Sequence, residues 1–200
     1  MRNDREHTDK FNRIIQAAIK VFARKGFFNS RVSEIAREAG VADGTIYLYF
    51  QNKDDILISL FEVSMDAVIR NMREVLDREA DPRKKIQLFA IQHLQMLETN
   101  KELAEVIQVE LRQSVKFMKE YKNEKFLQYL NLVSDVVREG QEQGVFRKDI
   151  VPGVAKRAFF GALDEMSRYW VLSSKKKYDI RTAAEQISSL FIQGMTANAA

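Results

Sequence analysis

The side chains best suited to specific recognition lie close together in residues 43–50, DGTIYLYF. A carboxylate, a hydroxyl and two phenols are interspersed there with apolar side chains, and each of these polar groups can form hydrogen bonds. Ile46 and Phe50 are predicted to point inward, which leaves a polar leading edge on a short helix. Gly44 lets the backbone at this edge approach a partner closely, because no side chain intervenes.

Residues with catalytic or metal-binding chemistry are scarce. The absence of cysteine excludes thiol catalysis, a zinc knuckle and a disulfide-stapled secreted domain, and favours the reducing cytoplasm. Of the two histidines, His7 lies in a polar stretch, and His93 on an apolar stripe is either a core residue or a ligand sensor. Three acidic residues near apolar neighbours are candidate paired carboxylates that no pattern brings together: Glu110, Asp164 and Glu165. There is no P-loop or dinucleotide-binding glycine motif, so we expect neither an enzyme nor a metal or cofactor.

Residues 43–50 follow another short helical pattern across a tight turn at residues 40–42. Apolar residues from Val32 to Ala39 predict that first helix, with Ser30 as its candidate cap and Gly40 at its end. Together with the helix predicted for residues 43–50, this is a helix-turn-helix arrangement. In such a motif the second helix enters the major groove of DNA, where every base pair presents a distinct pattern of donors and acceptors.

An amphipathic helix precedes this motif and supports it. Its apolar residues recur at helical spacing from Phe11 to Phe22, with Thr8 as a candidate cap and Gly26 at the end. Residues 1–53 hold ten Lys/Arg and six Asp/Glu, a net charge of +4, whereas residues 54–200 hold 22 of each. This excess is typical of a domain that binds nucleic acid or another anionic surface, although ordinary variation also produces it.

The rest of the chain is also predicted to be helical, since 200 residues include only 8 Gly and 2 Pro and no alternating strand pattern. A long helix from Asp54 to Glu79 precedes Pro82, Gly140 and Gly144 mark a loop, and the last helices are expected near 152–172 and 180–195. We therefore expect an all-α protein of about nine helices, with a helix-turn-helix domain at residues 8–53 and a helical bundle at 54–200. No stretch is apolar enough to span a membrane, and no signal peptide is expected.

The run from Ile14 to Leu57 resembles the DNA-binding domain of the TetR family of bacterial transcriptional repressors, through IAREAG, GVADGTIYLYF and NKDDIL. The resemblance implies base and phosphate contacts from Ser33, Asp43, Gly44, Thr45, Tyr47, Tyr49 and Lys53. Thr45 and Tyr47 would contact phosphate or a thymine methyl group, and Asp43 a cytosine amino group. Alternatively, Tyr49 packs within the domain and Lys53 is only solvated.

The chain also departs from the family pattern. Arg31 and Ala42 stand where the family often has Ser or Thr, so hydroxyl caps and phosphate contacts must come from Ser30 and Asp43 or be absent.

The last two helices are predicted to form a dimer interface, because one recognition helix reads only a few base pairs and such motifs usually bind palindromes as dimers. These helices carry more apolar side chains than one inward stripe needs, and the TetR resemblance implies the same interface. It comprises Ala162, Met166, Trp170, Ile187, Leu190 and Phe191. Alternatively, these residues form a core within one chain.

The middle helices contain large, adaptable side chains that either form a core or line a cavity for an apolar ligand. The chain is similar to TetR-type regulators of fatty-acid degradation, whose effector is a long-chain acyl-CoA. The similarity lies in GVADGTIYLYF, NK and DILISLF, and in VELRQS at residues 109–114. This likeness implies an effector site at Phe89, His93, Met96, Arg112, Phe117, Met118, Tyr121, Phe126, Phe159, Phe160 and Leu163. Cations for the CoA phosphates are available at Arg83, Lys84, Lys85, Arg112, Lys116 and Lys119.

The expected function is that of a cytoplasmic, dimeric repressor that binds palindromic operator DNA, controls fatty-acid degradation genes and is released by a long-chain acyl-CoA. The acyl-CoA would shift the long helix and so change the separation of the two recognition helices. Two alternatives stay open: a TetR-type sensor of another hydrophobic effector, such as a drug or lipid, and a helical protein-interaction module that does not bind DNA.

Overall fold

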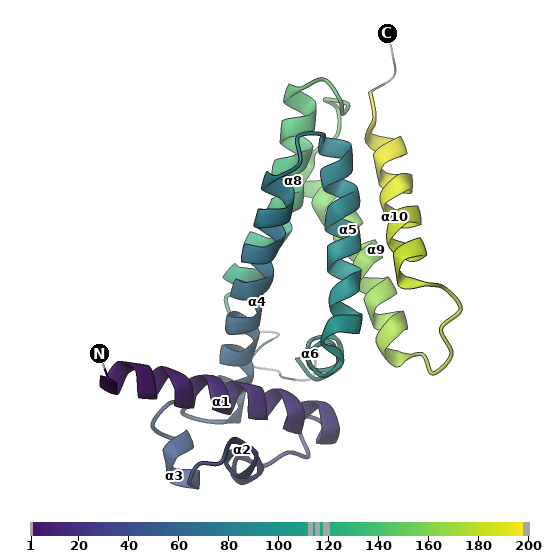
Figure 1. The fold of residues 1–200 in the computed structure, drawn as a ribbon. Helices are drawn as coiled ribbons and strands as arrows, with labels where there is room; N and C mark the ends of the chain where they lie inside the picture. Colours follow the sequence, from purple (N-terminus) through teal and green to yellow (C-terminus); the bar gives the residue numbers. More distant parts are fainter. Residues whose placement is uncertain (1, 112–113, 115–116, 118–120, 198–200) are drawn as a thin grey trace. The chain divides into compact units, whose positions relative to one another are not determined.

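The computed structural model describes residues 2–111, 114, 117 and 121–197. These residues form nine α-helices and one π-helical turn (Figure 1). Within the described ranges, strand-like pairing is limited to one isolated bridge between Phe146 and Thr196. The prediction of an all-α protein with about nine helices is confirmed.

The chain packs as two compact units. These units do not divide the chain at residue 53, where the sequence predicts the boundary between two domains. The first unit contains the described residues of Met1–Ser64 together with those of Asn100–Lys122, and the second contains those of Met65–Thr99 and Asn123–Ala200. The division of function between residues 8–53 and 54–200 stays a prediction.

The first unit begins with α1 (Arg2–Lys25), which packs on α2 (Val32–Ala39). The prediction that Thr8 caps this helix is wrong, because α1 begins six residues earlier. No Gly or Pro interrupts this polar stretch, and Lys10 bonds Glu6 one turn away at 2.8 Å. The predicted end is confirmed, since Gly26 follows the helix with a φ of +80°.

The cap of α2 differs from the prediction. The N-cap residue is Arg31, whose backbone N–H donates to the Glu34 carboxylate at 3.0 Å. The hydroxyl of Ser30 donates instead to the carbonyl of Phe27 at 2.8 Å. The prediction that Ser30 caps α2 is therefore wrong, because an acid inside the helix already satisfies the N-cap residue.

The predicted helix at residues 43–50 is shorter in the structure, where α3 covers Asp43–Ile46. Beyond it the chain continues as turns, with bonds from the N–H of Leu48 to the carbonyl of Thr45 and from that of Tyr49 to that of Ile46. These three-residue bonds tighten the chain. Ile46 and Phe50 are both buried, so the predicted inward pair is confirmed.

The first unit is completed by the start of α4 (Lys53–Asp77), by α6 (Lys101–Glu105) and by the π-helical turn η1 (Val106–Glu110). Both α6 and η1 contact α1.

The second unit contains the remainder of α4, which ends at Asp77 rather than Glu79, together with α5 (Pro82–Thr99), α8 (Glu124–Glu142), α9 (Pro152–Leu172) and α10 (Ile180–Met195). Helix α5 contacts α8, α9 and α10 (Figure 1). Asp179 caps α10 by accepting from the backbone N–H of Thr182 at 2.9 Å.

Gly140 was expected in a loop, and this prediction is wrong because it lies inside α8. The chain turns at Gly144, where φ is +71°, and returns Phe146 onto the helix. A Cβ atom at Gly140 would lie 2.1 Å from the Phe146 ring. The glycine therefore serves close packing rather than a turn.

Candidate nucleic-acid interface and effector region

The leading edge of α3 is held outward by buried neighbours. Asp43 and Gly44 are exposed, Thr45 is half-buried, and Tyr47 is 59% exposed beside the fully buried Ile46. Ser33, on α2, is also exposed. The predicted contact residues of these two helices can therefore reach a partner without any rearrangement of the core.

Leu48 is a residue of this edge that the sequence analysis missed. It is 78% exposed, although leucine is usually buried. It lies two positions after Ile46, off the inward stripe, and that spacing could have revealed it. A large apolar side chain on an outward recognition edge is suited to contact a thymine methyl group.

Tyr49 packs within the domain, which is one of the two roles that the sequence left open. Its half-buried ring lies 4.4 Å from the ring of His7 and 6.3 Å from that of Phe11, both on α1. Tyr49 therefore packs between α1 and the turn after α3, and its DNA contact stays a prediction.

Lys53 binds the turn between α1 and α2. Its ammonium donates to the carbonyl oxygens of Phe27, Phe28 and Ser30 at 2.5, 3.2 and 3.0 Å. It also lies 4.6 Å from the centre of the Phe27 ring, and burial lowers the pKa of Lys53 despite the opposing charge of Asp54. The alternative of a merely solvated Lys53 is wrong. An ammonium has three N–H donors, so a phosphate would have to displace one of these carbonyls.

Carboxylates of α2 partly neutralise the basic face of α1. Lys20 and Arg24 lie 3.9 and 3.6 Å from the Glu38 carboxylate, and Lys25 bonds Glu34, which lowers the pKa of that acid. The positive excess of this domain is therefore weaker along this half of α1 than the sequence suggests.

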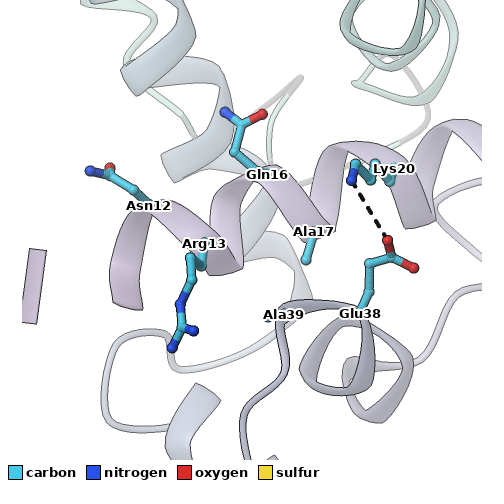
Figure 2. A pocket seen from close by; sticks show the side chains of 7 residues that line it. All are labelled: Asn12, Arg13, Gln16, Ala17, Lys20, Glu38 and Ala39. Atoms are coloured by element: carbon cyan, nitrogen blue, oxygen red, sulfur yellow. Dashed lines mark ion pairs between the residues drawn. The ribbon is translucent and has the colours of Figure 1, made fainter. Parts of the chain in front are cut away.

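A pocket of about 310 Å³ lies along the same face (Figure 2). Most of the residues that line it have polar or charged side chains: Asn12, Arg13, Gln16, Ala17, Lys20, Glu38 and Ala39. Figure 2 shows the Arg13 guanidinium apart from the Lys20–Glu38 pair. Within the described part of the chain Arg13 makes no ion pair, which makes it a candidate phosphate ligand that the sequence analysis did not name.

The second unit brings several predicted effector residues into one aromatic cluster. Ring centres lie 6.0 Å apart for Phe89 and Phe159, 5.6 Å for His93 and Phe160, and 4.9 Å for Phe126 and Phe160. Leu163, on α9, is fully buried, and Met96 is half-buried.

Tyr129, one of the large side chains of the middle helices, also joins this cluster. It is almost completely buried, its ring lies 5.1 Å from that of Phe89, and its hydroxyl lies 2.8 Å from Nδ1 of His93. Burial raises its pKa far above the ordinary value, so Tyr129 carries its proton and can donate.

The partners of His93 fix its protonation. The Ser167 hydroxyl donates to the carbonyl of Leu163 at 2.8 Å and therefore can only accept from Nε2 of His93, 3.3 Å away. Nδ1 then carries no proton and accepts a hydrogen bond from the Tyr129 hydroxyl. Burial lowers the pKa of His93 to about 4, against a smaller opposite effect of Asp164, so the ring is neutral near pH 7. These contacts favour the core histidine of the two predicted alternatives.

The other predicted effector residues are distributed differently. Phe117 and Tyr121 belong to the first unit, where their rings lie 5.0 and 6.2 Å from that of Phe61. Arg112 and Met118 lie outside the described residues. Of the three candidate carboxylates, Glu110 lies in the first unit, and Asp164 and Glu165 lie in the second.

The predicted interface residues on α9 and α10 are mostly half-buried: Ala162, Met166, Ile187 and Phe191. Leu190 is 70% exposed, whereas Trp170 is only 8% exposed and has the Lys176 ammonium 4.7 Å from its ring. Beside Leu190 lies a largely apolar pocket of about 610 Å³, whose lining includes two exposed valines that the sequence analysis missed, Val151 and Val154.

Among the residues that the structure describes, no helix combines the length and apolar character that crossing a membrane requires. No three His, Asp or Glu side chains in the same ranges are placed to hold a metal ion together.

Comparison with known proteins supports the helix-turn-helix assignment. The family of bacterial regulatory proteins named tetR matches residues 14–60, and the C-terminal region of YsiA-like proteins matches residues 61–194. The chain is 39% identical over 186 residues, 93% of its length and 95% of the relative, to a fatty acid metabolism regulator protein of Bacillus subtilis.

Two solved structures share the fold at similar identity. One is the transcriptional regulator FadR from Bacillus subtilis in complex with stearoyl-CoA, with a TM-score of 0.85 at 38% identity, covering 92% of this chain and 99% of that one. The other is the fatty acid degradation regulator FadR from Bacillus halodurans, with a TM-score of 0.84 at 37% identity and the same coverage. With both of its regions matched, the chain belongs to the TetR family of bacterial regulatory proteins.

Proposed function

We propose that this chain is a dimeric transcriptional repressor that binds palindromic operator DNA and dissociates from it when a long-chain acyl-CoA binds. The observation that carries the proposal is the exposed polar and aromatic edge of α3 on a buried support, in a chain of the TetR family. Its likeness to fatty acid regulators supports control of fatty-acid degradation genes. A repressor acts where the chromosome lies, so we place it in the cytoplasm.

In the proposed complex, α3 enters the major groove. Thr45 and Tyr47 contact phosphate or thymine methyl groups, and Asp43 accepts a hydrogen bond from a cytosine amino group. Ser33 on α2 and Arg13 on α1 bind flanking phosphates, which set the register of the domain on the duplex. In this account Lys53 acts indirectly, since it already binds the turn before α2.

A second copy of the chain is the proposed occupant of the apolar surface on α9 and α10. The pocket beside Leu190 and the exposed Val151 and Val154 form an apolar patch that a soluble monomer rarely leaves open. Two-fold pairing through this patch would present two α3 edges to the two halves of a palindrome, with centres about 34–36 Å apart or at a multiple of that distance.

The aromatic cluster of the second unit is the proposed site of the acyl chain. Phe89, Phe126, Phe159 and Phe160 provide apolar walls that can repack around a guest. The likeness to a regulator solved with stearoyl-CoA favours an acyl-CoA over other apolar ligands. Of the cations suggested for its phosphates, Lys85 is engaged by Glu139 at 2.7 Å.

Helix α4 is the proposed route from effector to DNA. It contributes Lys53–Ser64 to the first unit and Met65–Asp77 to the second, so one continuous helix belongs to both. A shift of α4 on acyl-CoA binding would change the separation of the two recognition edges in the dimer.

The test uses fluorescence anisotropy with a labelled palindromic duplex selected by the chain from a random pool. We expect log affinity to fall linearly with log salt, because phosphate contacts release counterions. We also expect saturating stearoyl-CoA to release the duplex, with CoA alone as the control. Absence of binding at low salt would contradict the whole proposal. Release by a drug-like or lipid compound but not by stearoyl-CoA would support DNA binding with a different effector.

A further inference from the structure

The turn between α1 and α2 is held from two sides by residues that are distant in sequence. On one side, Lys53 at the start of α4 binds the carbonyls of Phe27 and Ser30. On the other, the carboxylate of Glu110 accepts a hydrogen bond from the backbone N–H of Phe27 at 2.5 Å, across 83 residues of sequence. The backbone of Phe27 is thus held at both its N–H and its carbonyl.

Glu110 is unusual for an acidic residue. It is buried, and it is the last residue of the π-helical turn η1. Such turns are rare in proteins, and those that occur often lie at functional sites. The backbone at Gly26 packs closely against Glu110, because a Cβ atom at Gly26 would lie 3.4 Å from the Glu110 carboxylate. Removing the carboxylate would leave a buried N–H without its acceptor, which is costly.

The turn that Glu110 holds leads directly into the helix-turn-helix. The carbonyl of Phe27 also accepts from the Ser30 hydroxyl, and α2 begins two residues after Ser30. Helix α2 in turn packs on α3, which carries the recognition edge. A change at Glu110 therefore reaches α3 through hydrogen bonds and packing within one compact unit.

Glu110 also follows the proposed effector region closely along the chain. Helix α5 carries Phe89 and His93 and ends at Thr99, and α6 begins at Lys101. A second polar contact ties the same segment to the start of α4, since the Ser114 hydroxyl donates to the Asp54 carboxylate at 2.7 Å.

We propose that Glu110 is a positioning residue for operator binding. It fixes the position of α2 and α3 through the N–H of Phe27, and it passes a change in the segment after α5, caused by effector binding, to these two helices. The transmission rests on the proposed release of DNA by acyl-CoA, whereas the positioning of α2 and α3 requires only operator binding. The two parts are therefore measured separately.

The test compares Glu110→Ala and Glu110→Gln with the unaltered chain, and Glu102→Ala is the matched control because it removes an exposed charge from α6. Circular dichroism and thermal unfolding first identify a temperature at which every variant is folded. Dissociation constants are then measured for the selected operator and for a random duplex of equal length.

We expect Glu110→Ala to weaken operator binding about tenfold while random-duplex binding changes less than about twofold, because positioning affects specific contacts most. Glu110→Gln should be intermediate, since its amide oxygen can still accept from Phe27, and Glu102→Ala should behave as the unaltered chain. Equal loss on both duplexes, or no loss on either, would overturn the positioning role. If Glu110→Ala does not fold, Glu110→Gln decides: an operator affinity equal to that of the unaltered chain would overturn the proposal.

The second measurement is the ratio of operator dissociation constants with and without saturating stearoyl-CoA. Glu110→Ala should reduce this ratio about fivefold or more, with its stearoyl-CoA affinity in the absence of DNA unchanged. An unchanged ratio would overturn the transmission role. If the unaltered chain shows no response to stearoyl-CoA, the proposed effector and the transmission role both fail, while the comparison of duplexes still decides the positioning role.

Discussion

The buried His93 predicts a specific loss of stability in acid. Burial lowers its pKa from the usual 6.5 to about 4, because the charged imidazolium loses its hydration in the core, and the nearby Asp164 opposes this effect only in part. The unfolded chain therefore takes up a proton as the pH falls below about 6.5, while the folded chain resists protonation until about 4. The stability contributed by neutral His93 is complete above pH 6.5 and is lost as the pH falls from 6.5 to 4.

The magnitude follows from the two pKa values. At about 1.4 kcal/mol for each pKa unit, the difference between 6.5 and about 4 corresponds to about 3 kcal/mol of unfolding free energy. This is a large part of the about 5–15 kcal/mol that stabilises a typical protein. The loss should therefore be measurable above the contribution of surface carboxylates.

The assay is urea unfolding followed by the fluorescence of Trp170, the only tryptophan of the chain, which lies in the same unit as His93. Between pH 7 and pH 4 the unaltered chain should lose about 3 kcal/mol more than His93→Gln. His7→Gln, at the other, exposed histidine, is the control and should follow the unaltered chain. Parallel pH profiles for the unaltered chain and His93→Gln would refute the reasoning.

Three further predictions test the recognition edge, the core and the proposed interface. Leu48→Ser should weaken operator binding about fivefold by removing an apolar contact, while Leu172→Ser, also at an exposed leucine, should have no effect in the same anisotropy assay. Equal affinities of these two variants would contradict a role of Leu48 in recognition. Gly140→Ala should destabilise the chain by about 2 kcal/mol in thermal unfolding, because its Cβ would meet the Phe146 ring at 2.1 Å. Gly153→Ala, where the added Cβ meets nothing within 4 Å, is the control, and an equal midpoint for both variants would show that the ring moves aside freely. Leu190→Glu should convert the dimer into a monomer in light scattering, because it puts a charge on the proposed interface, and a persistent dimer would place that interface elsewhere.

The regular parts of the fold could be predicted from the sequence because they depend on local signals. The last two helices were expected near 152–172 and 180–195, and α9 and α10 have these bounds. Apolar spacing set them, together with a proline at the first position of α9. The outward edge of α3 was predictable for the same reason, since Ile46 and Phe50 define an inward side.

The parts that could not be predicted depend on partners distant in sequence. Nothing near Glu110 indicates that it binds Phe27, and nothing near Lys53 indicates three carbonyl partners. Aromatic residues at helical spacing look alike whichever cluster they join, so Phe117 and Phe159 were predicted together although they pack in different units. The helix starts at Thr8 and Ser30 failed because several nearby residues can satisfy the same backbone groups.

The measurement that tests the central claim most directly is a thermodynamic cycle of operator and stearoyl-CoA binding. The operator dissociation constant is measured without and with saturating stearoyl-CoA, and the stearoyl-CoA dissociation constant without and with saturating operator. Linkage requires the two ratios to be equal, and the proposed repressor predicts that both exceed about fivefold in the direction of mutual weakening. Ratios of one would contradict the account, because the two ligands would then bind this chain independently.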